Sequence, residues 1–168
     1  MLIDPGKLVP DLRNRSQVPQ EQWRVPSSCP VAHLIPHRAP FKFIDRIEHF
    51  DRDAQLLVAS YRVRKDASTF RGHFPQQPIF PGTLLIEAMG QAGACLASLF
   101  REDVEEGRPL LVRVHHALFL APVYPDDTLV IEVGLLEGDN LRAITTARVH
   151  RRFDLCAIAI LETHYVGR

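Results

Sequence analysis

The segment from Thr83 to Phe100 limits what this chain can fold into more than any other part of the sequence. Its one charged side chain is that of Glu87, and glycines and alanines fill the gaps between its leucines. A helix that is apolar around nearly its whole circumference has to be buried around nearly its whole circumference. The segment barely reaches the length that spans a bilayer, and it contains Gln91 as well as Glu87. We therefore predict a buried core helix, from Pro81-Gly82-Thr83 to about Arg101, and no membrane span.

Most of the remaining chain has the sequence pattern of β-strands. Aliphatic and β-branched residues recur, and two polar turns, Asp51–Ala54 and Glu137–Asn140, separate pairs of apolar segments. One buried helix among antiparallel strands predicts an α+β fold in which the sheet curls around the helix. Short connections favour a meander, where strands that are consecutive in sequence are neighbours in the sheet. The expected strands are Phe41–Phe50, Leu56–Val63, Leu110–Leu120, Leu129–Leu136, Leu141–Val149 and Leu155–Val166.

The first 30 residues differ from the rest, and we treat them as an arm that precedes a domain at residues 31–168. Prolines occur at positions 5, 10, 19, 26 and 30, and no apolar period is visible. We expect an extended arm with little regular structure of its own, with Trp23 as its contact to the body. Val31–Ile35 is expected to form a short helical turn before Pro36, and Ala67–Pro81 to form a loop.

Composition excludes some classes of function. The formal net charge is zero, whereas a nucleic-acid-binding domain normally carries a basic excess. The three cysteines, Cys29, Cys95 and Cys156, are far apart and odd in number. They suggest no disulfide framework and favour a reducing compartment. The N-terminus has no basic segment followed by an apolar one, as a signal peptide has, so we expect a cytoplasmic location.

Two ionisable side chains lie where the predicted structure restricts them. Glu87 is in the first turns of the buried helix, where an apolar environment disfavours its charged form, and Gln91 is one turn further on. His73 lies in a loop that glycine and prolines restrict. A fixed histidine and a carboxylic acid are the pair needed to remove a proton from one carbon and to protonate a hydroxyl leaving the next. The alternatives are an exposed Glu87 favoured by the helix dipole and a surface His73.

Three motifs, in the same order along the chain, resemble one enzyme family. The longest, GHFPQQPIFPGTLLIEAMGQ at residues 72–91, contains both His73 and Glu87. Upstream are IPHRAPF at residues 35–41 and Ile44-Asp45-Arg46, and downstream is APVYPDDTL at residues 121–129. Together they resemble the 3-hydroxyacyl-[acyl-carrier-protein] dehydratases of bacterial fatty-acid synthesis, over roughly residues 33–166.

The resemblance implies the hot-dog fold and gives each site residue a role. His73 would remove the proton next to the thioester carbonyl, and Glu87 would protonate the departing 3-hydroxyl. The backbone N–H of Gly82 would polarise the thioester carbonyl. The carbonyl of Ile79 would hold the other ring nitrogen of His73, and Gln91 would orient Glu87.

The resemblance also implies an assembly and a partner. The family works as a homodimer, often as a hexamer of three dimers, with the histidine from one subunit and the acid from the other. The partner would be acyl carrier protein bearing the 3-hydroxyacyl group, and no cofactor or metal is implied. Phe74 and Phe80 would lie at the substrate site.

Some positions depart from the family pattern. Gln76-Gln77 stands where Gly-Asn or Gly-Asp is common, Ala39 where Tyr is common, and Asp126 where Gly is common. These departures and the long arm put the acyl chain length and the pathway in doubt, and a secondary-metabolism or lipid-modification enzyme is one hypothesis. An acid that is Glu and not Asp favours plain dehydration without isomerisation of the double bond.

A basic cluster near the C-terminus has two interpretations. Arg148, His150, Arg151 and Arg152 form either a solvated strand end or a docking patch that attracts an acidic carrier protein.

The sequence also admits three alternatives. A hot-dog thioesterase uses a helix acid but does not need the His-Phe-Pro loop, so His73 favours dehydration. A non-catalytic family member would have lost His73 or Glu87, and both are present. Cys29, His33 and His37 could suit a metal by spacing, but prolines interrupt any helix that carries them and no fourth ligand is near.

Overall fold

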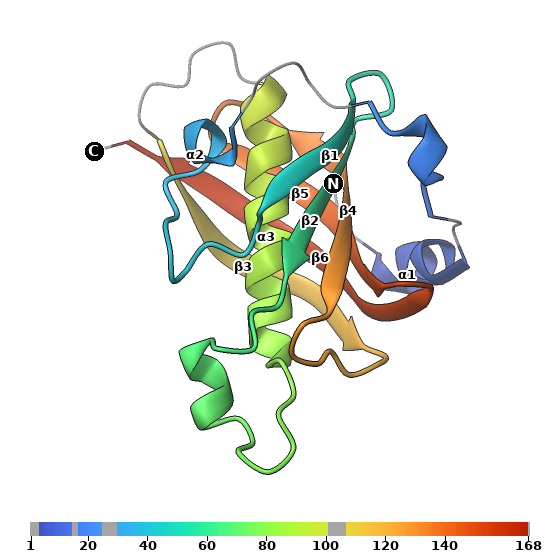
Figure 1. Cartoon of the computed structure of the whole chain (residues 1–168). Coiled ribbons are helices and arrows are strands. Elements are labelled where there is room, and N and C mark those ends of the chain that lie inside the picture. The colour runs from blue at the N-terminus through green and yellow to red at the C-terminus, as the bar shows by residue number, and fades with distance from the viewer. Residues whose placement is uncertain (1–3, 15–16, 25–29, 101–106, 168) are drawn as a thin grey trace.

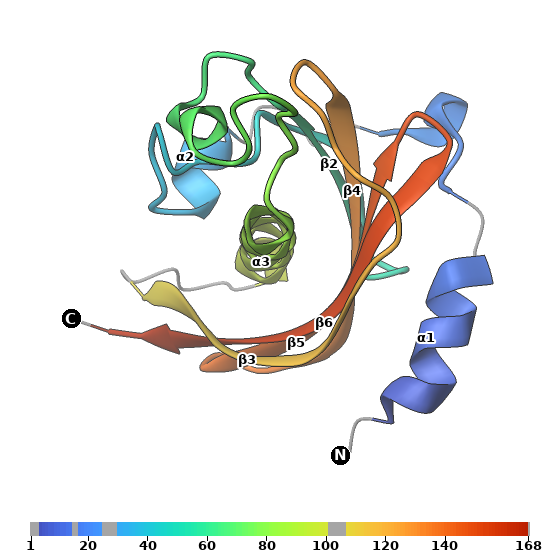
Figure 2. The same ribbon diagram turned by 90° about the horizontal axis from the view of Figure 1, so that it is seen from below.

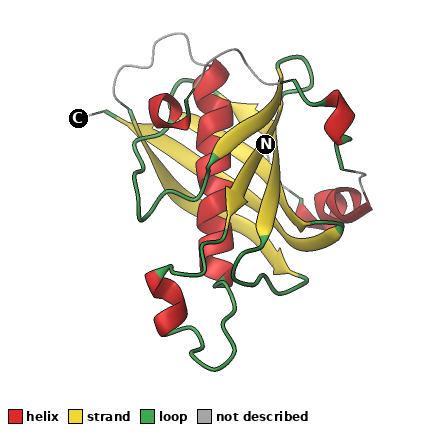
Figure 3. Ribbon diagram, in the orientation of Figure 1, coloured by secondary structure: helices red, strands yellow, loops and turns green. Residues whose placement is uncertain are grey.

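The fold consists of a long helix lying against the inner face of one antiparallel sheet (Figures 1 and 3). The computed structural model describes residues 4–14, 17–24, 30–100 and 107–167. The helices are α1 (Pro5–Asn14), α2 (Val31–Leu34) and α3 (Gly82–Phe100), with 3-10 turns η1 (Gln20–Gln22) and η2 (Ser68–Arg71). The strands are β1 (Arg46–Asp51), β2 (Leu56–Arg62), β3 (Arg108–Phe119), β4 (Thr128–Gly138), β5 (Arg142–Arg151) and β6 (Asp154–Val166).

The sheet curls around α3, which lies on its concave side (Figure 2). Leu85, Met89 and Leu96 of α3 are buried, and the helix packs against β2 to β6. At Gly93 a β-carbon would lie 2.9 Å from Oγ1 of Thr145, so glycine is needed for β5 to approach this closely. By length and composition α3 could cross a membrane, but most of it is buried within the sheet. The predicted buried helix and curled sheet are confirmed.

The predicted meander is wrong in its strand order. The sheet runs β1-β2-β4-β5-β6-β3, so β3 lies at an edge beside β6 and not between β2 and β4. The reason is that α3, and not a tight turn, connects β2 to β3 and carries the chain across the inner face of the sheet (Figure 1). The β1–β2, β4–β5 and β5–β6 hairpins agree with the prediction.

Most predicted elements agree with the structure to within a few residues. The first strand is the exception, because β1 begins at Arg46 and the chain from Phe41 to Asp45 leads into it without strand structure. The predicted turn at residues 31–35 is α2, and the loop before α3 contains η2. The predicted end of the core helix, at about Arg101, lies outside the described residues.

The prediction that the arm has little regular structure is wrong, because residues 5–14 form α1 on the convex side of the sheet (Figure 2). Pro5 occupies the first helical position, where a missing N–H costs nothing. Pro10 lies inside the helix, so propensity does not explain it. The helix is held by packing: Leu12, with Leu8 beside it, joins a small apolar cluster with Ile144, Ile158 and Ile160 on the sheet.

The arm is fastened beyond α1 by two hydrogen bonds between the backbone of Arg24 and β1. The N–H of Arg24 donates to Nδ1 of His49 (2.8 Å), and the N–H of Phe50 donates to the carbonyl of Arg24 (3.1 Å). Trp23 acts within the arm, where its indole N–H donates to the carbonyl of Val18 (3.2 Å).

An ion pair is buried beneath the arm, between Glu132 of β4 and Arg148 of β5. Their side chains are only 3% and 4% exposed. The arm completes the pair, because the N–H of Val18 donates to Oε1 of Glu132 (2.9 Å) and Nη1 of Arg148 donates to the carbonyl of Leu12 (3.2 Å). Arg148 is therefore not part of an exposed docking patch, and that part of the prediction is wrong.

Breaking this pair on one side is expected to be costlier than replacing both partners. Arg148→Met leaves the Glu132 carboxylate buried without its cation and should lower the free energy of unfolding by about 3 kcal/mol. Arg148→Met combined with Glu132→Leu should recover a large part of that loss, because no unpaired charge remains. Urea unfolding of both variants and the wild type gives the comparison. A single variant as stable as the wild type would contradict the role of the pair.

Candidate active site

His73 lies in the loop between η2 and α3, and its ring is fixed by two contacts. The Nδ1–H group donates to the carbonyl oxygen of Ile79, at 2.9 Å. The ring also lies against that of Phe74, with 4.1 Å between centroids, and Phe74 itself is half-exposed. With the Nδ1 proton engaged, Nε2 of a neutral ring is free to accept a proton. The contact predicted between Ile79 and His73 is present.

Glu87 lies on the second turn of α3, where Gln91 controls its orientation. The side-chain amide of Gln91 donates to Oε1 of Glu87 and to the carbonyl of Phe41, both at 2.9 Å. Its oxygen accepts from the N–H of Phe43, at 2.8 Å. Gln91 is only 1% exposed, and these three bonds leave its amide no other orientation. The predicted pairing of Glu87 with Gln91 is present.

A cavity of about 250 Å³ opens beside Glu87, between α3, the loop before β1 and the start of β3. Its wall is mainly apolar, with small residues on the α3 side and few polar groups, as is usual for a site that binds an acyl group. The residues around it are His37, Phe41, Glu87, Gly90, Gln91, Ala94, Pro109, Leu110, Leu111 and Thr163.

His37 belongs to this site, although the sequence suggested it only as a weak metal ligand. Its Nε2 is 3.5 Å from Oε1 of Glu87, and both side chains are about a quarter exposed. The two residues are far apart in sequence, so no spacing rule could pair them. The one available signal was that His37 lies inside a motif of the family resemblance.

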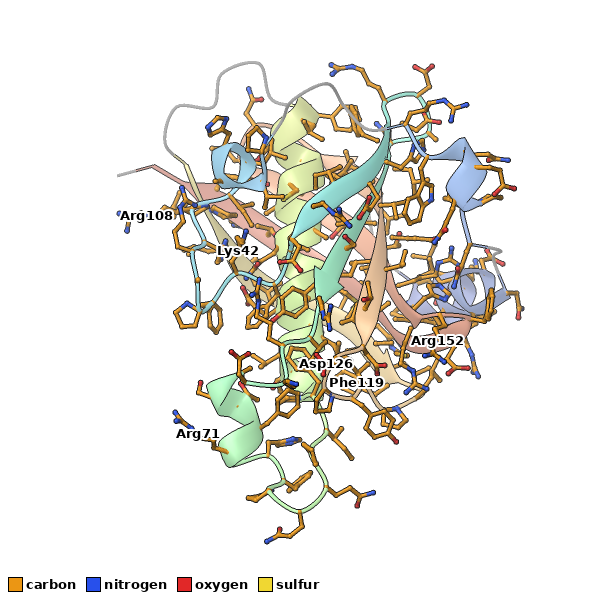
Figure 4. The ribbon with its side chains drawn as sticks, viewed as in Figure 1. Lys42, Arg71, Arg108, Phe119, Asp126 and Arg152 are labelled. Carbon is orange, nitrogen blue, oxygen red and sulfur yellow. The ribbon has the colours of Figure 1, made fainter. Side chains whose placement is uncertain are left out.

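The start of α3 brings Gly82 beneath an aromatic ring. A β-carbon on Gly82 would lie 2.9 Å from the ring of Phe119, which ends β3 near the lower end of the helix (Figure 4). A helix start presents backbone N–H groups and favours developing negative charge. Gly82 begins α3, and the role expected for its N–H stays a prediction. Its neighbour Phe119 was not predicted.

Phe80 does not line the cavity beside Glu87 and is a core residue. It is 3% exposed, and its ring packs against those of Phe43, Tyr61 and Phe70 at centroid distances of 6.1 to 6.2 Å. Its N–H donates to the carbonyl of Val123 (2.7 Å). The prediction that Phe80 contacts substrate is replaced by a supporting role, in which its ring anchors the end of the His73 loop.

The predicted basic patch does not form as one surface. Arg151 is held by Asp154 (2.7 Å) and Asp127 (3.5 Å), and it lies over the ring of Tyr124. Because Arg148 is buried as well, Arg152 is the exposed cation of the three (Figure 4).

His73 is not among the described residues that surround the cavity at Glu87. One wall of that cavity belongs to β3, which is an edge strand. Along it the described chain exposes apolar side chains: Leu110, Leu111, Val112, Val114 and Phe119. An exposed apolar edge strand of this kind is a ready template for pairing with another chain.

The sequence is similar to a family and to several known enzymes. The model of the FabA-like domain matches residues 35–159. The 3-hydroxyacyl-[acyl-carrier-protein] dehydratase FabZ of Fusobacterium nucleatum is 40% identical over 103 residues, covering 61% of this chain and 71% of that protein. The bifunctional enzyme LpxC/FabZ of Chlorobaculum tepidum is also 40% identical, over 134 residues, covering 79% of this chain but only 28% of that longer protein.

Solved structures show the same fold at low identity. The dehydratase heterocomplex ApeI:P from Xenorhabdus doucetiae has a TM-score of 0.69 at 18% identity, over 84% of this chain and 93% of that one. A mutant thioesterase from Pseudomonas aeruginosa has a TM-score of 0.57 at 19% identity, over 73% and 81%. Dehydratases and thioesterases thus share this architecture, and the fold alone does not separate them.

Loss of the Gln91 amide is expected to destabilise the protein. Gln91→Leu leaves the buried N–H of Phe43 without an acceptor and removes the donor to the part-buried carbonyl of Phe41, at a cost of about 2 kcal/mol in the free energy of unfolding. Urea unfolding measures the change, and Thr83→Leu, at an exposed position of the same helix, is the control. Equal stability of the two variants would show that the amide bonds contribute nothing.

Proposed function

Because this chain belongs to the FabA-like family, we propose that it removes water from 3-hydroxyacyl thioesters carried on an acyl carrier protein. The observation that carries the proposal is the fixed ring of His73, whose Nδ1–H is engaged by the Ile79 carbonyl and whose Nε2 is left as a base. Glu87, held by Gln91 beside an apolar cavity, supplies the acid. The Fusobacterium and Chlorobaculum relatives support the same chemistry.

The reaction follows from these two groups. Nε2 of His73 takes a proton from C2 of the substrate, and the released electron pair forms the double bond between C2 and C3 as the C3–O bond breaks. Glu87 gives its proton to the departing hydroxyl, so that water leaves and a trans-2-enoyl thioester remains. Negative charge that develops on the thioester oxygen is stabilised by the backbone N–H of Gly82 at the start of α3. Proton exchange with solvent then restores both groups.

A thioesterase is the alternative that the shared fold raises. It would direct Glu87 or an activated water at the thioester carbonyl and would release a free acid. A thioesterase of this kind does not need the histidine loop. The hydrogen bond that fixes His73 to Ile79 therefore favours dehydration.

We further propose a homodimer in which β3 of each subunit pairs with β3 of the other. The exposed apolar side chains of this strand would be covered, and the cavity at Glu87, whose wall includes Leu110 and Leu111, would be completed by the second copy. His73 of the partner subunit and Glu87 would then form one active site. A hexamer of three such dimers is the larger assembly that the family resemblance implies.

A cytoplasmic location is proposed on chemical grounds. Cys156 of β6 is a free, buried thiol, which suits a reducing compartment.

The reaction is tested by mass spectrometry of carrier-bound substrates. We expect the wild type to remove one water from 3-hydroxyacyl carrier protein, and His73→Ala and Glu87→Gln each to abolish measurable turnover, because each removes one proton-transfer group. Substrates of several chain lengths, and the matching coenzyme A thioesters, identify the preferred acyl group and carrier. Release of free 3-hydroxy acid would instead make the protein a thioesterase.

The shared site is tested by mixing the two inactive chains. When His73→Ala and Glu87→Gln are co-expressed, about half of the dimers are mixed, and each mixed dimer has one intact site. Activity should therefore return to about a quarter of the wild-type value. If both residues of a site came from one chain, no mixture would be active.

A further inference from the structure

The two oxygens of the Glu87 carboxyl group have different surroundings. Oε1 accepts a hydrogen bond from Gln91 at 2.9 Å and lies 3.5 Å from Nε2 of His37. Within the described residues, Oε2 has no such partner. An oxygen that faces two donors is poorly suited to carry a proton, because its lone pairs are already engaged.

The proton on the His37 ring can be assigned from its surroundings. Nδ1 of His37 is buried and has no hydrogen-bond partner in the described part of the chain. An N–H group in such a position would be a buried donor without an acceptor, which is costly. The neutral ring therefore carries its proton on Nε2, which is the nitrogen that faces Glu87.

The backbone around His37 is held rigidly enough for a positioning role. The guanidinium of Arg38 donates to the carbonyls of Ala32 (3.1 Å), Ile35 (3.0 Å) and His37 itself (2.8 Å). The hydroxyl of Ser98 on α3 donates to the carbonyl of Leu34 (2.9 Å), which fastens α2 to the helix that carries Glu87. These bonds fix the position of the His37 backbone relative to Glu87.

We propose that His37 is a positioning residue for the general acid of this enzyme. Together with Gln91 it holds Oε1 as the accepting oxygen, so that the transferable proton resides on Oε2, the oxygen that delivers it to the 3-hydroxyl group. The Nε2–H group of His37 also stabilises the Glu87 carboxylate that remains after the proton has left. The inference rests on the proposed function, because it assigns a proton within that reaction. The 3.5 Å separation is expected to shorten when substrate closes the cavity.

The test compares two substitutions that differ in one donor. His37→Leu removes the N–H group, whereas His37→Gln keeps an N–H group at a similar reach and cannot titrate. For His37→Leu we expect kcat to fall by about 10- to 100-fold with little change in KM, the loss of one hydrogen bond to a charged group. The alkaline limb of its kcat–pH profile should move to higher pH, because the carboxylate form has lost a donor. For His37→Gln, both kcat and the position of the alkaline limb should be close to the wild-type values. His33→Leu, at an exposed position on α2, is the matched control.

The outcomes separate this inference from the proposed function. If the wild type does not dehydrate any carrier-bound substrate, the proposed function is wrong, independently of any effect of the His37 substitutions. If the wild type is active and His37→Leu keeps its kcat and pH profile, the positioning role is overturned. Equal losses in His37→Leu and His37→Gln with no movement of the alkaline limb would show that the residue serves only the local structure. Urea unfolding of each variant identifies losses that come from instability.

Discussion

The burial of α3 inside the curled sheet is the constraint on which the other features depend. Because the sheet curls around the helix, side chains of α3 have to be small where a strand approaches closely, as at Gly93 beside Thr145. A polar group on such a helix has to find a defined partner, since water does not reach most of its surface. Glu87 and Gln91 meet this requirement through each other and through the backbone of Phe41 and Phe43. The core packing thereby also determines the orientation of the carboxyl group proposed as the general acid.

Features that depend on neighbouring residues could be predicted from the sequence. The apolar circumference of residues 83–100 predicted the core helix, and apolar segments separated by turns predicted the strands. Glu87 and Gln91 are one helical turn apart, so their contact follows from helix geometry. The Ile79 contact to His73 lies within one short loop, but its prediction required the family resemblance.

Features that depend on the packing of distant segments could not be predicted in this way. The position of β3 beside β6 depends on the path of α3 across the sheet, which no local pattern records. The sequence predicts an exposed Arg148 because strand alternation does not reveal that the arm covers that face. The helix α1 itself was missed, since two prolines obscure its pattern and its stability comes from Leu12 packing on the sheet. The contact between His37 and Glu87 could not be predicted either, because it joins two segments that are far apart in sequence.

The contact between the arm and the sheet also orders the events of protein synthesis. Arg148 and the carbonyl of Leu12 are separated by 136 positions in the sequence. The arm is synthesised before β5 and β6, the strands that bind it. Leu12 therefore has no binding surface until both strands have been made, and the Glu132–Arg148 pair stays uncovered until the arm folds back over it. Docking of α1 thus follows formation of the sheet and closes its convex face.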